Sequence, residues 1–131
     1  MSGINKVILV GHLGKDPDHR ILHGNVSVVT FPLATTESIM KDGVKVKQTE
    51  WHNIVMWRSL ADVAVKVLTK GKLVYIEGKC RTRSFQDKQG IHKHSTEIMV
   101  DSFILLSRSS DFDANSLPTY DFKAVDRRSG L

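Results

Sequence analysis

Cationic side chains and an aromatic residue alternate with other residues near the middle of the chain. Lys79, Arg81, Arg83 and Phe85 are separated by single residues. Residues of equal parity on a β-strand point to the same side, so a strand here presents three cations followed by a ring. Cations neutralise phosphates and flat rings stack on unpaired bases, a combination typical of surfaces that bind a single nucleic-acid strand.

Two tryptophans could supply further stacking surfaces. Trp51 and Trp57 lie in the segment TEWHNIVMW, where Val55 shares their parity. Stacking contributes roughly 1 to 3 kcal/mol per base and does not depend on which base is present. In a plainer interpretation both tryptophans belong to the core and the arginines form a solvated face. The spacing alone leaves both interpretations open.

Residue groups typical of metal binding do not emerge from the sequence. The histidines form two close pairs, His19 with His23 and His92 with His94. A metal ion needs three or four converging donors, and no cysteine lies near either pair. We therefore predict no metal site.

A catalytic grouping is also missing. The chain has no G-x-S-x-G, G-x-x-x-x-G-K or H-E-x-x-H motif. Asp16 and Asp18 flank a proline and fit a turn better than the paired carboxylates of a metal-dependent nuclease. Cys80 is the only cysteine, which excludes an intrachain disulfide, and we expect it to be a small buried side chain. We predict that the chain is not an enzyme and needs no cofactor.

The elements that must position these residues are mainly strands. Five segments have the composition and alternation of β-strands: residues 5–13, 26–37, 49–57, 72–85 and 93–106. The first is apolar on both parities, which predicts a strand buried on both faces. Asp42-Gly43 between extended arms predicts a hairpin tip, and the polar loop 86–90 predicts a second one.

One helix is expected between the third and fourth strands. Apolar residues recur there at helical spacing, at Leu60, Val63, Ala64, Val67 and Leu68. Ser59 is the expected N-cap, and Gly71 is expected to end the helix. One short helix among five strands favours a small, partly closed barrel of the OB type over a doubly wound sheet.

Length and charge limit the class of protein. With 131 residues the chain can bury one core, so we expect one domain over residues 1–106 and a flexible, Ser- and Asp-rich tail over 107–131. The net charge of +5 lies entirely in residues 1–106, which favours a polyanionic partner. No apolar run approaches the roughly 20 residues that span a bilayer, so we expect a soluble, cytoplasmic protein with no membrane partner.

Three stretches in order resemble the bacterial single-stranded DNA-binding protein family over about the first 106 residues. They are NKVILVGHLGKDP at 5–17, TEWHNIV at 49–55 and KGKLVYIEGKCRTRSF at 70–85. The resemblance implies an OB fold, a homotetramer, and sequence-independent protection of single-stranded DNA during replication, repair and recombination. It also implies possible contacts with replication and repair proteins.

The resemblance assigns roles by position. Trp51 and Phe85 match stacking aromatics, and Trp57 stands where the family often has phenylalanine. His52, within the TEWH match, is expected at an oligomer contact. The expected phosphate contacts are Lys70, Arg81 and Arg83, with Lys6, Arg20 and Lys72 as weaker candidates.

Two departures from the family pattern carry consequences. Ile39 in TESIM replaces a common stacking tryptophan, which predicts weaker binding or an altered site size. The sequence ends DRRSGL instead of an acidic tip, which puts partner recruitment through that tip in doubt. An alternative function, as an OB-type module that binds proteins more than DNA, therefore stays open.

Overall fold

The computed structural model describes residues 2–106, which form six strands and one helix. The elements are β1 Val7–Leu13, β2 Asp18–Leu22, β3 Val26–Lys41, β4 Val44–Trp57, α1 Ser59–Val67, β5 Leu73–Gln86 and β6 His92–Leu105. The predicted tail, residues 107–131, lies outside the described residues.

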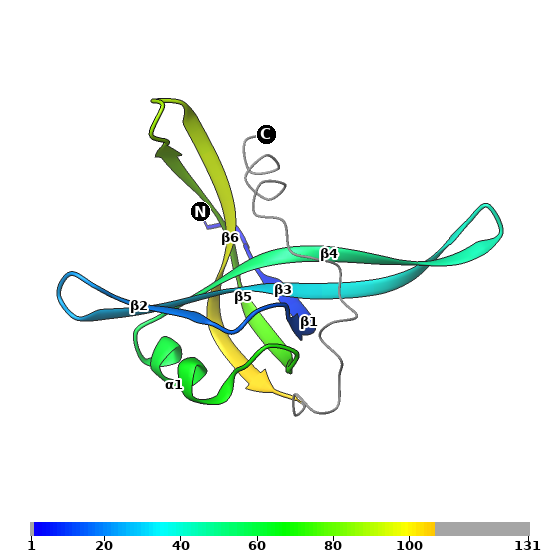
Figure 1. Cartoon of the computed structure of the whole chain (residues 1–131), viewed down its shortest axis with the longest axis horizontal. Coiled ribbons are helices and arrows are strands. Elements are labelled where there is room, and N and C mark those ends of the chain that lie inside the picture. The colour runs from blue at the N-terminus through cyan, green and yellow to red at the C-terminus, as the bar shows by residue number, and fades with distance from the viewer. Residues whose placement is uncertain (1, 107–131) are drawn as a thin grey trace.

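Five of the strands close into a barrel (Figure 1). The strand order is β1-β5-β6-β4-β3, and β1 pairs again with β3 to close the ring. Closure brings Gly11 so near to β3 that an added Cβ would lie 2.3 Å from the Ala34 carbonyl oxygen. The predicted five-stranded OB barrel is therefore confirmed.

The core fills the barrel from alternate positions of its strands. It consists chiefly of Leu13, Val29, Phe31, Leu33, Ile54, Met56, Val74, Ile76, Ile98 and Val100. Helix α1 packs on β3 and β4 and contributes Ala61 and Ala64 to the same cluster, and Leu68 follows directly after the helix. Burial of this apolar surface is the main force that holds the barrel together.

Strand β2 is a difference from the sequence-based expectation. Its residues, DHRIL, lie outside the five strands predicted from the sequence, yet they pair antiparallel with β3 from Asp18↔Thr30 to Leu22↔Val26. All five are exposed, so no apolar alternation marks the strand in the sequence. Counting β2, the helix lies between β4 and β5, which is still between the third and fourth strands of the barrel.

The start of the helix was predicted wrongly. Ser59 is the first helical residue, and the N-cap is Arg58, which has φ 60° and makes no side-chain cap bond. The apolar stripe is also rotated, since Ala61 is buried and Val63 is 50% exposed. Alanines let the helix axis approach the sheet closely, which explains why small residues face the core. Gly71 does not end the helix, which stops at Val67 with Leu68 as C-cap.

Two burial predictions also fail. The outer side of β1 is open, with Ile8 56% and Val10 48% exposed, so this strand is buried on one face only. Cys80 is exposed as well. Its backbone N–H and carbonyl both bond to the side-chain amide of Asn5, at 3.1 and 2.7 Å.

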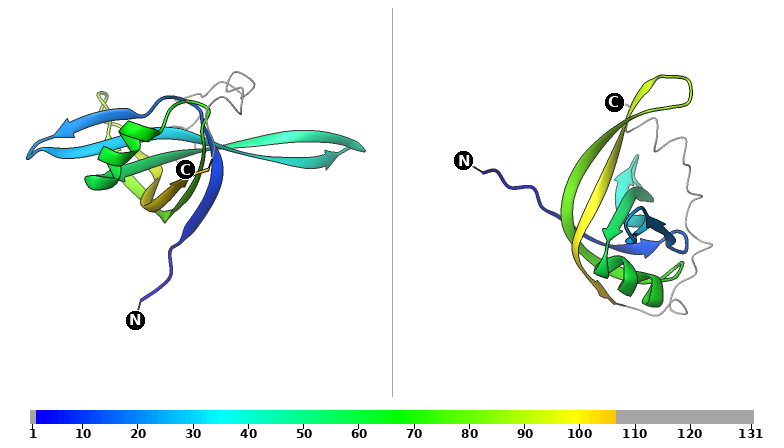
Figure 2. Two further views of the ribbon diagram at one scale, coloured as in Figure 1. Left: turned by 90° about the horizontal axis from the view of Figure 1, so that it is seen from below. Right: turned by 90° about the vertical axis from the view of Figure 1, so that its left-hand side faces the viewer.

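Two of the hairpins that project from the barrel, β3–β4 and β5–β6, point in different directions (Figures 1 and 2). The longer is formed by β3 and β4 and turns at Asp42 and Gly43, whose φ values of 52° and 78° fit the predicted tight turn. The other is formed by β5 and β6. The two hairpins separate because β4 and β6 pair only at Ile54↔Ile98 and Val55↔Met99.

Candidate nucleic-acid interface

One row of paired residues links the cationic strand to the tryptophan strand on the outer face. The register places Lys79 of β5 opposite Met99 of β6, Met99 beside Val55 of β4, and Val55 opposite Thr30 of β3. Ile54 and Met56, the neighbours of Val55, belong to the core cluster, whereas Val55 lies on the other side of β4, where it is 3% exposed. The predicted stripe of cations and the predicted tryptophan face therefore belong to one surface.

Trp51 and Arg83 lie on the same side of this row. Each is four residues from it, Trp51 before Val55 and Arg83 after Lys79, and β4 and β5 run in opposite directions. Four residues of strand correspond to about 13 Å. Because β4 and β6 no longer pair at this level, the two residues stand on separate hairpins.

The Trp51 ring is partly buried against the end of β1. Trp51 is paired with Ala34, and its six-membered ring lies over Gly14. A Cβ built on Gly14 would stand 2.5 Å from ring atom Cζ3 and 3.5 Å from Pro32. The N–H of Gly14 donates to the Pro32 carbonyl at 2.9 Å, which fixes this edge. Trp51 is thus not a member of the buried core.

Trp57 ends β4 on the same face and is 38% exposed. It is paired with Val28, which in turn is paired with Arg20 of β2. Arg20 contacts Asp18 through an ion pair of 3.2 Å. The Trp57 ring and the Arg20 guanidinium therefore lie in one cross-strand row, with β3 between them. This row exists because β2 pairs with β3.

The β5 stripe carries both cations and a ring. Arg81 and Arg83 are exposed, and the guanidinium carbon of Arg83 lies 5.2 Å from the Phe85 ring centroid, within cation–π range. Phe85 is partly buried and pairs with Lys93 of β6. Opposite Arg81 stands Glu97, the one acid among these cross-strand partners from Lys79 to Phe85.

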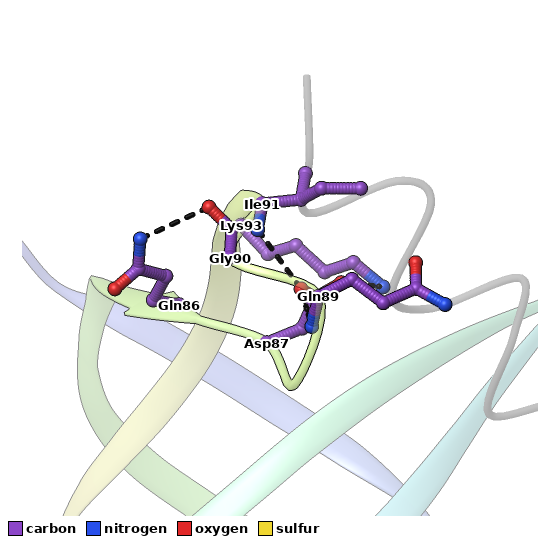
Figure 3. Close-up of polar contacts among 6 residues, drawn as sticks. All are labelled: Gln86, Asp87, Gln89, Gly90, Ile91 and Lys93. Carbon is purple, nitrogen blue, oxygen red and sulfur yellow. Dashed lines mark hydrogen bonds and ion pairs between the residues drawn. The ribbon is translucent and has the colours of Figure 1, made fainter.

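The tip beyond Phe85 is ordered by one carboxylate (Figure 3). Oδ1 of Asp87 accepts the backbone N–H groups of Gln89 and Ile91, both at 2.9 Å, and Oδ2 lies 3.6 Å from the Lys93 ammonium. The hydrogen bond from Ile91, supported by the other donors, lowers the pKa of Asp87. Gln86 also bonds to the Gly90 carbonyl at 2.9 Å.

Lys70, an expected phosphate contact, and the weaker candidates Lys6 and Lys72 lie away from this row. The Lys72 ammonium donates to the Val67 carbonyl at 2.6 Å, so it caps the C-terminal end of α1. Lys6 lies 3.8 Å from the Glu77 carboxylate. Lys70 is exposed in the loop before β5, and its backbone N–H bonds to Asp16 at 2.8 Å. None of the three joins the row that links β5 to β4.

His52 alternates with Trp51 and points to the other side of β4, where its partner is Leu33. A 2.8 Å hydrogen bond joins its Nε2 to the Thr35 hydroxyl. Partial burial lowers the pKa of His52, and the nearby Glu50 charge opposes that shift. The residue is therefore separate from the stacking surface.

Three lysines near the same surface were not singled out from the sequence. Lys45 and Lys47 share the parity of Trp51 and oppose Met40 and Ser38 on the long hairpin. Lys93 opposes Phe85. Lys45 and Lys47 could have been identified from the sequence by counting every second residue back from Trp51. Lys93 could be identified only once the pairing of β5 with β6 was known.

Ile39, the predicted gap in the stacking surface, pairs with Val46 on the alternate side of the long hairpin. Among residues 2–106, no three potential metal ligands cluster. Within the same residues no helix has the length and apolar character needed to cross a membrane.

Comparison with known proteins connects this geometry to a family. Residues 4–106 match the model of the single-strand binding protein family. A protein of Chlorobaculum tepidum named single-stranded DNA-binding protein 1 is 43% identical over 90% of this chain and 74% of its own length. Single-stranded DNA-binding proteins of Bacteroides thetaiotaomicron and Neisseria meningitidis are 44% and 42% identical, each over 79% of this chain and 66% and 60% of their own lengths.

A solved structure agrees with the fold. The Plasmodium falciparum SSB complex with ssDNA superposes with a TM-score of 0.75 at 32% identity, covering 82% of this chain and 98% of that one. The chain belongs to the single-strand binding protein family.

Proposed function

We propose that the chain binds single-stranded DNA without base specificity and protects it during replication, repair and recombination. The observation that carries the proposal is the single outer face that joins the β5 cations to the β4 tryptophans. Its relatives are named for single-stranded DNA binding, and the family consists of non-catalytic DNA-binding proteins. We place this action in the cytoplasm, on the DNA of the nucleoid.

In this mechanism cations attract the phosphate backbone and rings then hold the bases. Arg81, Arg83 and Lys79 bind phosphates, and the counterions that the DNA releases make affinity fall as salt rises. Trp51, Trp57 and Phe85 stack on bases that are unpaired, so a duplex, whose bases are already stacked, competes poorly. We propose that the strand runs from Phe85 on one hairpin to Trp51 on the other.

The hairpins complete the surface. Lys45 and Lys47 continue the face of Trp51 toward the Asp42-Gly43 tip. Lys93 flanks Phe85 at the other tip. We propose that both tips close over the bound strand. Arg20 and Lys70 stay candidates at the margin, while the structural contacts of Lys6 and Lys72 make them weaker ones.

A fluorescence titration tests the proposal. Oligo-dT should quench the tryptophan emission strongly at low salt and less at high salt, and duplex DNA of equal length should compete weakly. Trp51→Ala and Phe85→Ala should each weaken binding by roughly 1 to 3 kcal/mol. Lys66→Ala, on the exposed side of α1, is a control that removes a charge away from the strand faces.

The rival function predicts a different result. If the module binds proteins more than DNA, the Trp51 and Phe85 variants keep full function and oligo-dT causes no quenching at low salt. That outcome would overturn the stacking mechanism.

We also propose that the chain assembles into the homotetramer that the resemblance implies, with His52 at an oligomer contact, and that it recruits replication and repair proteins.

A further inference from the structure

Glu97 places a carboxylate in the middle of the cationic surface. It stands on β6 opposite Arg81, and its Oε1 lies 3.5 Å from Nε of Arg83. Only 13% of the Glu97 side chain is exposed, against 60% of the Arg83 side chain. The acid is therefore mostly covered, while the guanidinium that it contacts is open to solvent.

Arg83 has two partners. Its guanidinium contacts Glu97 and also lies over the Phe85 ring, with a distance of 5.2 Å from its central carbon to the ring centroid. A guanidinium in this position is oriented before DNA arrives. Its charge, however, is already balanced by a neighbouring carboxylate.

We propose that Glu97 competes with the DNA backbone for Arg83. In the free protein the carboxylate pairs with the guanidinium, and a phosphate displaces it when a strand binds. This inference rests on the proposed function, because it assigns a regulating residue to the same site. The acid lowers affinity and so eases release of the strand.

The exchange has a consequence that can be measured. A cation that neutralises a phosphate steepens the dependence of log K on log salt by about 0.7 for a single strand. At Arg83 the counterion released from the phosphate is offset by a cation taken up at the Glu97 carboxylate once its pairing with Arg83 is broken. Arg83 therefore adds almost nothing to the salt slope while Glu97 is present.

Glu97→Gln should restore the contribution of Arg83 to the salt slope. The expected slope for oligo-dT is steeper by about 0.7, so the ratio of affinities at 50 and 200 mM NaCl rises roughly 2.5-fold. Asp101→Asn is the matched control, since it removes one exposed carboxylate from the same strand. It should leave the slope unchanged. In an Arg83→Met background, Glu97→Gln should also leave the slope unchanged.

A second comparison needs no change at Glu97. Arg83→Met alone should alter the slope little, whereas Arg81→Met should lower it by about 0.7. The proposal is overturned if Glu97→Gln keeps its circular dichroism spectrum but not the steeper slope, or if Arg83→Met and Arg81→Met lower the slope equally. Failure of the wild-type protein to bind oligo-dT would instead overturn the proposed function.

Discussion

At the scale of single residues, the position of the Trp51 ring depends on the absence of a side chain at Gly14. The ring lies where a Cβ on Gly14 would be, 2.5 Å from Cζ3 and 2.7 Å from Cη2. The backbone at Gly14 is not in the left-handed region, so an alanine there is resisted by the ring alone. Gly14 thus acts as a positioning residue for a stacking surface.

Gly14→Ala should displace the indole and weaken binding of oligo-dT by part of the roughly 1 to 3 kcal/mol that one stacked base contributes. The measurement uses a Trp57→Phe background, in which Trp51 is the only tryptophan. Gly3→Ala is the control, because nothing lies within 4 Å of that position. With Trp51→Phe, whose ring is shorter, Gly14→Ala should cost little more. Equal losses in both backgrounds would contradict this account.

His52 gives the folded state a dependence on pH. Burial lowers its pKa below the ordinary 6.5, so the unfolded chain takes up a proton more readily than the folded chain. Stability should fall as the pH drops through 6.5 toward the folded pKa and level off below it. Urea unfolding at fixed protein concentration, with His52→Gln against wild type, measures this. His23→Gln, in an exposed turn, should keep the wild-type profile.

At the scale of elements, composition and period-2 alternation were enough to predict the five barrel strands, but not the open outer face of β1, which is apolar on both parities. Parity alone placed Arg81, Arg83 and Phe85 together, and the register agrees. Strand β2 was not predicted because all five of its residues are exposed and so show no alternation of apolar and polar residues. They form a strand by pairing with β3. The N-cap at Arg58 was not predicted because this residue adopts a positive φ in the turn that follows β4 and makes no hydrogen bond with a capping side chain.

The register between strands could not be predicted from the sequence either. The pairing of β5 with β6 decides which residue of β6 lies opposite Arg83 and that Glu97 contacts it. The register of this pairing shifts between Glu77 and Gly78. A shift of one residue moves every side chain to the other face. Composition predicts that a surface is cationic, but only the pairing reveals the acid within it.

The β5–β6 tip is an element whose order depends on Asp87. Asp87→Ala removes the acceptor of the Gln89 and Ile91 amides, so their hydrogen exchange should speed up and oligo-dT affinity should fall modestly as Phe85 and Lys93 lose their support. Asp87→Asn can keep the acceptor while losing the ion pair with Lys93, and should have a smaller effect.

The tip should also resist acid. The lowered pKa of Asp87 means that its stabilising bonds are fully present above the ordinary value of 3.8 and are lost only as the pH falls through the lower, folded value. The amide shift of Ile91, followed by NMR from pH 6 downward, should therefore stay constant past 3.8. A midpoint at or above 3.8 would contradict the role assigned to this carboxylate.

At the scale of the whole molecule, the outer face of the β1–β5–β6 sheet is divided in two. One end carries the cations, and the other carries apolar side chains on rows in which Val10 pairs with Tyr75 and Tyr75 with Ile104. Ile8, Val10 and Ile104 are each about half exposed. Contiguous exposed apolar surface is typical of an interface, which supports the proposed assembly into tetramers.

Val10→Glu should break that assembly. Burying a valine stabilises an interface by roughly 1.5 to 3 kcal/mol, and a carboxylate in its place must also be desolvated. Light scattering after size exclusion should show a smaller species than the wild type, with an unchanged circular dichroism spectrum. Ile21→Glu makes the same kind of change on exposed β2 and should leave the mass unaltered. A wild-type monomer, or an unchanged Val10→Glu mass, would rule out this end of the sheet as the oligomer interface. A smaller species that still quenches with oligo-dT would separate assembly from stacking, because the apolar and cationic ends would then act independently.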